Sequence, residues 1–146
     1  MSSPILLHVD DDLLANKVME KCLEVVESSV RLIHVSTGWE AIEFLRTRME
    51  ECAGENFMPE VIVVDVNMPW LNGMEFVNTC ELLLGRGCFE HTKLVFCTSE
   101  WTPERIAGLK QLEIQLKVSC SSIQKPITPA KLEKLVGPDR KLNIIT

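Results

Sequence analysis

The sequence predicts an α/β fold in which a parallel sheet is covered by helices on both faces. Short apolar runs recur along the chain, stretches with helical periodicity lie between them, and most runs end in a carboxylate, a hydroxyl or an amine. The alternation repeats five times, and successive parallel strands need a crossover connection of the length that such helices supply. We therefore expect one three-layer, doubly wound domain with a five-stranded parallel sheet.

The predicted strands are short apolar runs, which is typical of strands that are buried on both faces. They span residues 5–9, 30–35, 61–66 and 94–97, with a weaker fifth run at 121–124. The predicted helices carry apolar residues at helical spacing, which places these side chains on one helical face. The clearest faces are Leu14, Val18, Cys22 and Val26, then Val77, Cys80 and Leu84, then Ile106, Leu109 and Leu112.

Capping residues mark where the helices begin. Thr37 and Glu40 form a capping box, in which each side chain accepts a backbone N–H of the first turn. A threonine followed by proline precedes two further helices, at 102–103 and 128–129. Gly137 is the expected end of the last helix. We therefore place one domain at 1–136 and a short C-terminal tail, too short for an output domain, at 137–146.

The composition excludes several classes of protein. The chain has 146 residues, a net charge of -6 and no clustered run of Lys and Arg, so a nucleic-acid surface is not expected. No apolar run reaches membrane-spanning length, and the first one stops at three aspartates, unlike a signal peptide. The six cysteines contain no C-x-x-C pair, which favours reduced, buried thiols. We expect a cytoplasmic protein.

Reactive side chains follow the ends of four predicted strands. Asp10, Asp65, Thr98 and Lys125 stand at these positions, and the carboxyl ends of parallel strands meet at one edge of the sheet. The adjacent carboxylates of Asp10 and Asp11 repel each other unless a cation lies between them, and Mg²⁺ prefers such oxygen ligands. The simpler alternative is an exposed acidic turn or a helix cap, a role to which the next aspartate in the run is suited.

Asp65 is the candidate nucleophile of this edge. A carboxylate oxygen can attack phosphorus to give an aspartyl phosphate, a reaction that depends on positioning and charge neutralisation. Thr98 offers a hydroxyl and Lys125 an ammonium to the transferred group. Taken singly, a strand-ending aspartate, a strand threonine and a surface lysine are all ordinary. Their joint occurrence in this order predicts a phosphoryl-transfer site.

The segment 65–69, Asp-Val-Asn-Met-Pro, followed by Asn72 and Gly73, resembles the receiver domain of two-component response regulators. The resemblance extends from about Ile5 to about Val136. It implies a flavodoxin-like strand order of 2-1-3-4-5 and a phosphoryl group transferred to the aspartate from a histidine kinase or a histidine phosphotransfer protein. It also implies a chain that signals through protein partners and catalyses only its own phosphorylation and dephosphorylation.

The same resemblance implies the roles of the site residues. Mg²⁺ would be held by Asp10, Asp11, Asp65 and the backbone carbonyl of Asn67, and the Lys125-Pro126 bond would be cis. The catalytic set would be Asp65 as phosphoacceptor with Thr98 and Lys125. One departure stands out. Receivers usually carry an aromatic residue three positions before the lysine, and this chain has Ser122, so the coupling of the threonine to an aromatic switch is not expected here.

Two rival functions remain open on the sequence. One is a receiver-like binding module that is no longer phosphorylated, although the acids and the lysine are all present. The other is a haloacid-dehalogenase-type phosphatase that uses Asp10 and Asp12, although Leu14 departs from the Thr or Val of that family. The three histidines, His8, His34 and His91, share no metal-ligand spacing. Trp70 and Trp101 follow the site motifs closely and are candidates for its border or for partner contacts.

Overall fold

A computed structural model describes residues 4–68, 71–117, 120–135 and 143–145. Strands and helices alternate along the chain, as the sequence predicts. The strands are β1 (Ile5–Val9), β2 (Arg31–Val35), β3 (Val61–Asp65), β4 (Lys93–Thr98), β5 (Cys120–Gln124) and β6 (Asn143–Ile145). The helices are α1 (Leu13–Val25), α2 (Gly38–Glu51), α3 (Gly73–Leu84), α4 (Pro103–Leu116) and α5 (Pro129–Leu135). Gly137, Trp70 and Pro69 lie outside the described residues.

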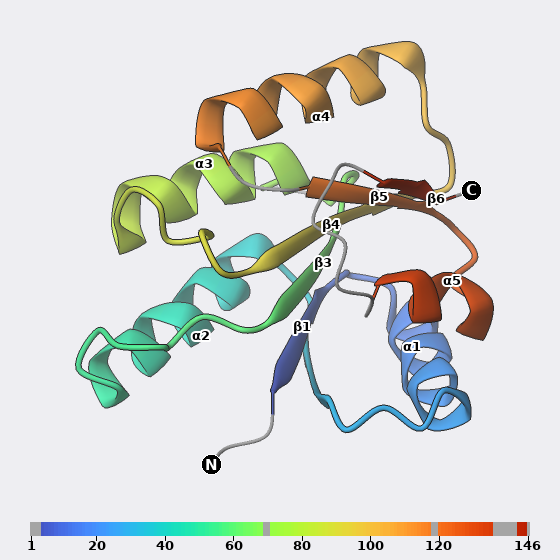
Figure 1. Cartoon of the computed structure of the whole chain (residues 1–146), viewed down its shortest axis with the longest axis horizontal. Coiled ribbons are helices and arrows are strands. Elements are labelled where there is room, and N and C mark those ends of the chain that lie inside the picture. The colour runs from blue at the N-terminus through green and yellow to red at the C-terminus, as the bar shows by residue number, and fades with distance from the viewer. Residues whose placement is uncertain (1–3, 69–70, 118–119, 136–142, 146) are drawn as a thin grey trace.

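All strands of the sheet are parallel. The order is β2-β1-β3-β4-β5-β6, so the predicted order of the first five strands is confirmed. The sixth strand pairs with β5 through Ser121 and Asn143, Ser122 and Ile144, and Ile123 and Ile145. From the sequence alone, these last residues are expected to form only a tail. The C-terminal segment therefore covers the edge of β5 that a five-stranded sheet would leave open (Figure 1).

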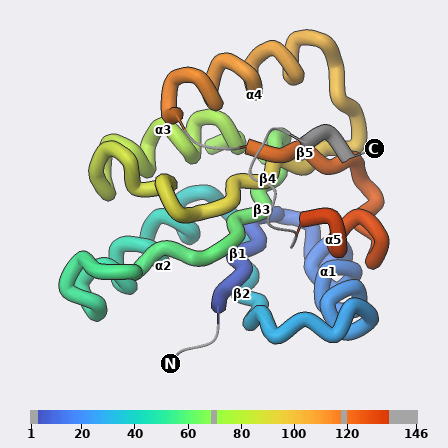
Figure 2. Tube along the Cα trace, in the orientation of Figure 1, coloured from blue at the N-terminus to red at the C-terminus, as the bar shows by residue number. Residues whose placement is uncertain are grey.

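Helices cover both faces of the sheet, and each face has its own apolar core. One core joins the sheet to α2, α3 and α4 and contains Leu45, Phe76 and Leu109. The other joins the sheet to α1 and α5 and contains Met19 and Leu132. Figures 1 and 2 show α1 and α5 side by side, away from the other three helices. Because strand residues alternate between the two faces, the continuous apolar runs supply both cores.

The predicted helix caps are confirmed. The hydroxyls of Thr37, Thr102 and Thr128 each accept a backbone N–H of the following turn. The capping box differs in one detail, because the Glu40 carboxylate accepts the N–H of Ser36 at 3.3 Å. No helix in the described ranges has both the length and the apolar character needed to cross a membrane.

The segment after α2 lies at the edge where the strands begin. Two non-glycine residues, Ala53 and Asn56, take left-handed backbone conformations there, with φ of 53° and 47°. The Arg48 side chain ties the segment back to the helix by donating to the Phe57 carbonyl at 2.8 Å. Residues 56–60 of the segment line a cavity of about 500 Å³ together with residues 87–88 and 90–92. This cavity is at the opposite edge from the carboxyl ends of the strands.

Candidate functional site

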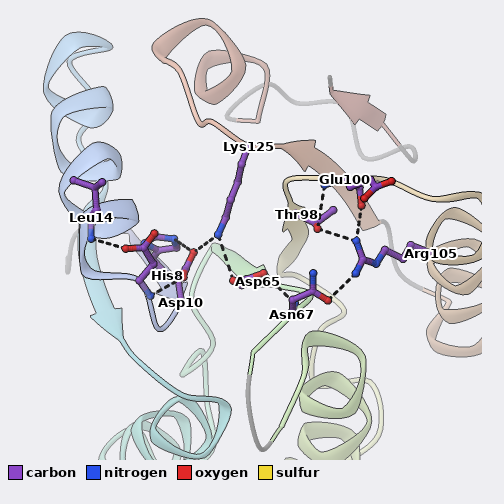
Figure 3. A network of polar contacts seen from close by, with 10 residues as sticks. His8, Asp10, Leu14, Asp65, Asn67, Thr98, Glu100, Arg105 and Lys125 are labelled. Atoms are coloured by element: carbon purple, nitrogen blue, oxygen red, sulfur yellow. Dashed lines mark hydrogen bonds and ion pairs between the residues drawn. The ribbon is translucent and has the colours of Figure 1, made fainter.

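The four strand-end residues predicted to converge do so. Asp65 and Thr98 are the last residues of β3 and β4, and Asp10 and Lys125 directly follow β1 and β5. Because β1, β3, β4 and β5 are neighbours in the sheet, their carboxyl ends place these side chains at one edge. Figure 3 shows the Lys125 ammonium reaching the carboxylates of Asp10 and Asp65.

Asp10 is fully buried, with an exposed fraction of 0%. Its backbone N–H donates to the Val35 carbonyl, which fixes the turn after β1 beside the end of β2. One carboxylate oxygen accepts the Asp12 N–H at 2.9 Å, and the other accepts the Lys125 ammonium at 2.9 Å. The cost of burying this charge is offset by these charge-assisted hydrogen bonds.

Asp65 is also buried, with an exposed fraction of 7%. One oxygen accepts the Asn67 N–H at 3.0 Å, and the other lies 3.3 Å from the Lys125 ammonium. Burial raises the pKa of Asp65, and the nearby Asp10 charge raises it further, whereas the Asn67 N–H and Lys125 act in the opposite direction. The net result is a raised pKa. The ionised carboxylate is therefore held in a site that disfavours its charge, which increases its tendency to bind a cation.

Lys125 is positioned by the turn between β5 and α5. The Lys125-Pro126 peptide bond is cis, as expected. Burial disfavours the ammonium form, but the hydrogen bond to Asp10 and the charges of Asp10 and Asp65 outweigh burial and raise the pKa of Lys125. Lys131 of α5 supports the turn by donating to the Gln124 carbonyl at 2.7 Å and to the Pro126 carbonyl at 3.0 Å. The sequence analysis did not identify Lys131.

Three acids form a group with metal-binding geometry. Oxygens of Asp10, Asp11 and Asp65 all lie within 4.8 Å of one another. Among the described residues, Lys125 is the one cation bonded to them, so two negative formal charges remain. All the donors are hard oxygens, and the set therefore fits Mg²⁺. Asp12 is outside this group. Its carboxylate accepts the Leu14 N–H at 2.9 Å and caps α1, as the simpler alternative for that residue proposed.

A glycine at the start of α3 allows the helix to approach Asp65 closely. A Cβ on Gly73 would lie 3.0 Å from the Asp65 carbonyl oxygen and 3.3 Å from the Val66 Cα, both of which are backbone atoms. Neither can move aside cheaply. The Asn-Gly pair of the sequence motif therefore serves packing around the site, with the Asn72 side chain capping α3 by accepting the Glu75 N–H.

Thr98 has a partner that the sequence analysis missed. Its hydroxyl accepts Arg105 Nη1 at 3.2 Å, and the same guanidinium reaches the Asn67 side-chain oxygen at 2.9 Å (Figure 3). Arg105 lies in the first turn of α4, where a cation opposes the helix dipole. That unfavourable position was the available signal that this arginine is bound to something other than its own helix.

Two of the three histidines lie together beside the acidic group. His8 on β1 and His34 on β2 have ring centroids 5.4 Å apart, and His8 Nε2 is 3.8 Å from an Asp10 oxygen. Burial lowers the pKa of His8 to about 4, so the ring is neutral near pH 7. Their ring nitrogens have no hydrogen-bond partner among the described residues. Within the ranges that the structure describes, the group with metal-binding geometry consists of Asp10, Asp11 and Asp65.

Ser122 lies on β5, and Trp101 is hydrogen-bonded to the same strand. Ser122 is buried, with an exposed fraction of 1%, and is aligned with Phe96 of β4. The Trp101 indole N–H donates to the carbonyl of the adjacent Ile123 at 3.0 Å, which ties the segment between β4 and α4 to β5. Trp101 is thus a packing residue at the border of the site. Whether Ser122 weakens the switch stays a prediction.

All six cysteines are free thiols; four of them are buried as predicted, whereas Cys52 and Cys88 are partly exposed. Burial raises the pKa of Cys97 and of Cys120 to about 12, so these thiols stay protonated at neutral pH. Cys97 is the β4 partner of Asp65 in the sheet register. A protonated thiol there adds no charge beside Asp65.

Comparison with known proteins identifies the fold. No protein-family model matches the sequence, and no curated protein matches it significantly. Among solved structures, the Vibrio cholerae chemotaxis protein CheY4 is 23% identical, with a TM-score of 0.66 and coverage of 91% of this chain and 95% of the other. A two-component response regulator from Cytophaga hutchinsonii is 22% identical, with a TM-score of 0.72 and coverage of 92% and 95%. A bacteriophytochrome response regulator, RtBRR, is 25% identical, with a TM-score of 0.68 and coverage of 93% and 76%. The chain has the fold of CheY-like receiver domains.

Proposed function

We propose that this chain is a response regulator receiver that accepts a phosphoryl group on Asp65. The donor would be a phosphohistidine of a histidine kinase or a histidine phosphotransfer protein, and Mg²⁺ would be required. The observation that carries the proposal is the position of the Asp65 carboxylate, which is bonded to the Lys125 ammonium and lies within a group of three acids. A nucleophile, a cation and a metal-binding group meet at one edge of the sheet.

In the proposed reaction, a carboxylate oxygen of Asp65 forms a bond to phosphorus. The phosphorus–nitrogen bond of the donor breaks, and its electron pair returns to the imidazole, which takes up a proton. Catalysis here depends on alignment and on compensation of negative charge. The Asn67 N–H bonded to Asp65 fixes the direction of the carboxylate, and Lys125 compensates charge on the incoming oxygens. The buried Thr98 hydroxyl would donate to a phosphoryl oxygen.

Asp10, Asp11 and Asp65 are the residues that would hold Mg²⁺, with the Asn67 carbonyl as a further expected ligand. When bound, the ion would neutralise charge on the phosphoryl oxygens. Asp10 has a second task, because it holds Lys125 in place before the donor arrives. The chain itself would act as a cytoplasmic signalling protein, not as an enzyme with a separate substrate, and its output would pass through protein partners.

The acceptor is tested with acetyl phosphate and Mg²⁺. Wild type should gain the mass of one phosphoryl group, labile to hydroxylamine, and Asp65→Asn should gain none. Asp12→Asn is the matched control, because Asn also caps helices well and Asp12 is outside the acid group. It should be phosphorylated like wild type. Loss of phosphorylation in Asp12→Asn but not in Asp65→Asn would support the phosphatase alternative. If wild type gains no phosphoryl group, the receiver-like binding module that is not phosphorylated would be the supported alternative.

The metal site is tested separately by titration with Mg²⁺. Asp11 is exposed, so Asp11→Asn changes a ligand with little effect on packing. We expect its Mg²⁺ affinity to fall at least about tenfold, because affinity depends on the number of charged ligands. Removal of one of three mutually repelling acids should also raise the melting temperature of the metal-free protein. A lower melting temperature would identify Asp11 as a structural residue.

A further inference from the structure

Arg105 connects three separate parts of the site edge. Its Nη1 donates to the Thr98 hydroxyl at the end of β4 and to the Glu100 carbonyl at 2.6 Å. Its Nη2 donates to the side chain of Asn67, which follows β3. Asn67 in turn donates its backbone N–H to Asp65. A single side chain from the first turn of α4 is therefore connected to Asp65 through one intermediate residue, Asn67.

The acceptors of this guanidinium are all uncharged. They are a hydroxyl, a backbone carbonyl and an amide oxygen, and no ion pair of Arg105 occurs in the described ranges. The side chain is half-buried, so part of its hydration has been exchanged for these neutral contacts. A guanidinium bonds more strongly to anionic oxygens than to neutral ones, and its planar fork matches phosphoryl oxygens. Among the described residues, Arg105 is therefore a cation without an anionic partner, and it is connected through Asn67 to the residue proposed to gain negative charge.

We propose that Arg105 is a second cationic contact of the phosphoryl group, on the side of the site away from Asp10. This inference rests on the proposed function of Asp65. On phosphorylation the guanidinium exchanges at least one neutral acceptor for a phosphoryl oxygen, while Lys125 remains beside Asp10 and Asp65. Figure 3 shows the two cations approaching the Asp65 and Asn67 pair from different elements, Lys125 after β5 and Arg105 on α4.

The exchange also gives α4 a direct connection to the acceptor. Thr102 caps the helix by accepting the backbone N–H of Arg105 itself, so a shift of this residue acts on the cap. Trp101, immediately before the cap, is tied to β5 through the Ile123 carbonyl. A movement of Arg105 toward the phosphoryl group would therefore act on the positions of the first turn of α4 and of the end of β5. This route requires no aromatic residue at the position of Ser122.

The experiment measures the affinity of the Mg²⁺-loaded protein for beryllofluoride, a phosphoryl mimic, by fluorine NMR. We expect Arg105→Gln to weaken binding roughly tenfold or more, the loss typical of a charge-assisted hydrogen bond. Arg105→Lys should lose less because it keeps the charge. Lys110→Gln is the matched control, since it removes a positive charge from the exposed face of the same helix, and it should bind like wild type. Amide shifts at the start of α4 should respond to beryllofluoride in wild type and respond less in Arg105→Gln.

Mg²⁺ affinity without beryllofluoride separates a phosphoryl contact from a structural role. It should change little in Arg105→Gln, because Arg105 is bonded to none of the three acids and contacts Asn67 only through its side chain, not through the backbone carbonyl expected to bind the ion. Equal beryllofluoride affinity in wild type and Arg105→Gln would overturn the inference while leaving the function of Asp65 intact. Equal losses of Mg²⁺ and beryllofluoride affinity would also overturn it. A wild type that binds Mg²⁺ but no beryllofluoride would remove the proposed function and this inference together.

Discussion

The Lys125 ammonium lies closer to the Asp10 carboxylate, at 2.9 Å, than to the Asp65 carboxylate, at 3.3 Å. Asp10 is the more deeply buried of the two acids. Its carboxylate accepts the backbone N–H of Asp12 at one oxygen and depends on Lys125 at the other. The lysine therefore compensates mainly the charge of Asp10. Asp65 keeps a weaker contact with the ammonium, which leaves one of its oxygens less tightly held.

Lys125→Gln should destabilise the metal-free protein by roughly 2–3 kcal/mol. The substitution leaves the buried Asp10 charge without its cation, and the estimate is below that for fully buried pairs because Lys125 is 24% exposed. The same loss of positive charge should tighten Mg²⁺ binding, so the deficit should shrink when Mg²⁺ is added. Melting curves with a chelator and with Mg²⁺ measure both effects. A deficit that Mg²⁺ does not reduce would show that Lys125 acts through packing.

Asp65→Asn should stabilise the metal-free protein at pH 7 by about 1 kcal/mol, or roughly 2–4 °C in Tm for a chain of this size. The pKa of Asp65 is higher in the folded state than in the unfolded chain, because of burial and then the Asp10 charge. Its contribution to stability is therefore fully present below the unfolded pKa and is lost as pH rises through the folded pKa. The gain should vanish in acid, where wild type is protonated. Equal stability at both pH values would contradict this.

His8→Leu should flatten the acid side of the stability profile. The folded pKa of His8, about 4, is below the unfolded value of 6.5. The neutral ring contributes stability above pH 6.5, and this contribution is lost as pH falls toward 4, because the unfolded chain then takes up a proton. The shift corresponds to about 3 kcal/mol. Denaturant titrations with chelator at pH 7 and pH 4.5 should therefore show a larger loss for wild type than for His8→Leu. Equal losses of stability in wild type and in His8→Leu would contradict a lowered pKa of His8 in the folded state.

Local pattern was sufficient to predict most of the site. Asp10, Asp65, Thr98 and Lys125 each directly follow or end an apolar run, so their meeting at one edge depends only on the strands being parallel and adjacent. The caps of α2 and α4 were equally local, since a threonine and the next turn lie within a few residues. Such features can be recognised in a single sequence because each depends only on residues that are close together along the chain.

The features that were missed depend on contacts between distant segments. Arg105 reaches Asn67 across 38 positions, and only the path of the chain between β4 and α4 brings them together. The contact of His8 with His34 follows from the register of β1 and β2. Strand β6 has three residues, too few for a periodic pattern, and its pairing with β5 exists only in the folded sheet.

Lys131→Met should slow phosphorylation of Asp65 by acetyl phosphate, although Lys131 is bonded to none of the acids. Its ammonium donates to the carbonyls of Gln124 and Pro126, the residues on either side of Lys125. Loss of both hydrogen bonds should cost about 1–3 kcal/mol of stability and widen the positions available to the Lys125 side chain. We expect a rate reduction of roughly tenfold.

Lys134→Met is the matched control for this prediction, because Lys134 is an exposed lysine of the same helix. It should change neither the stability nor the rate. Two arginine variants distinguish a positioning role from direct contact with the acids. Lys131→Arg keeps a hydrogen-bond donor and should recover part of the phosphorylation rate. Lys125→Arg alters the ammonium that contacts the acids and should not recover it. A Lys131→Met protein that is destabilised but phosphorylated at the wild-type rate would show that the turn places Lys125 without help from α5.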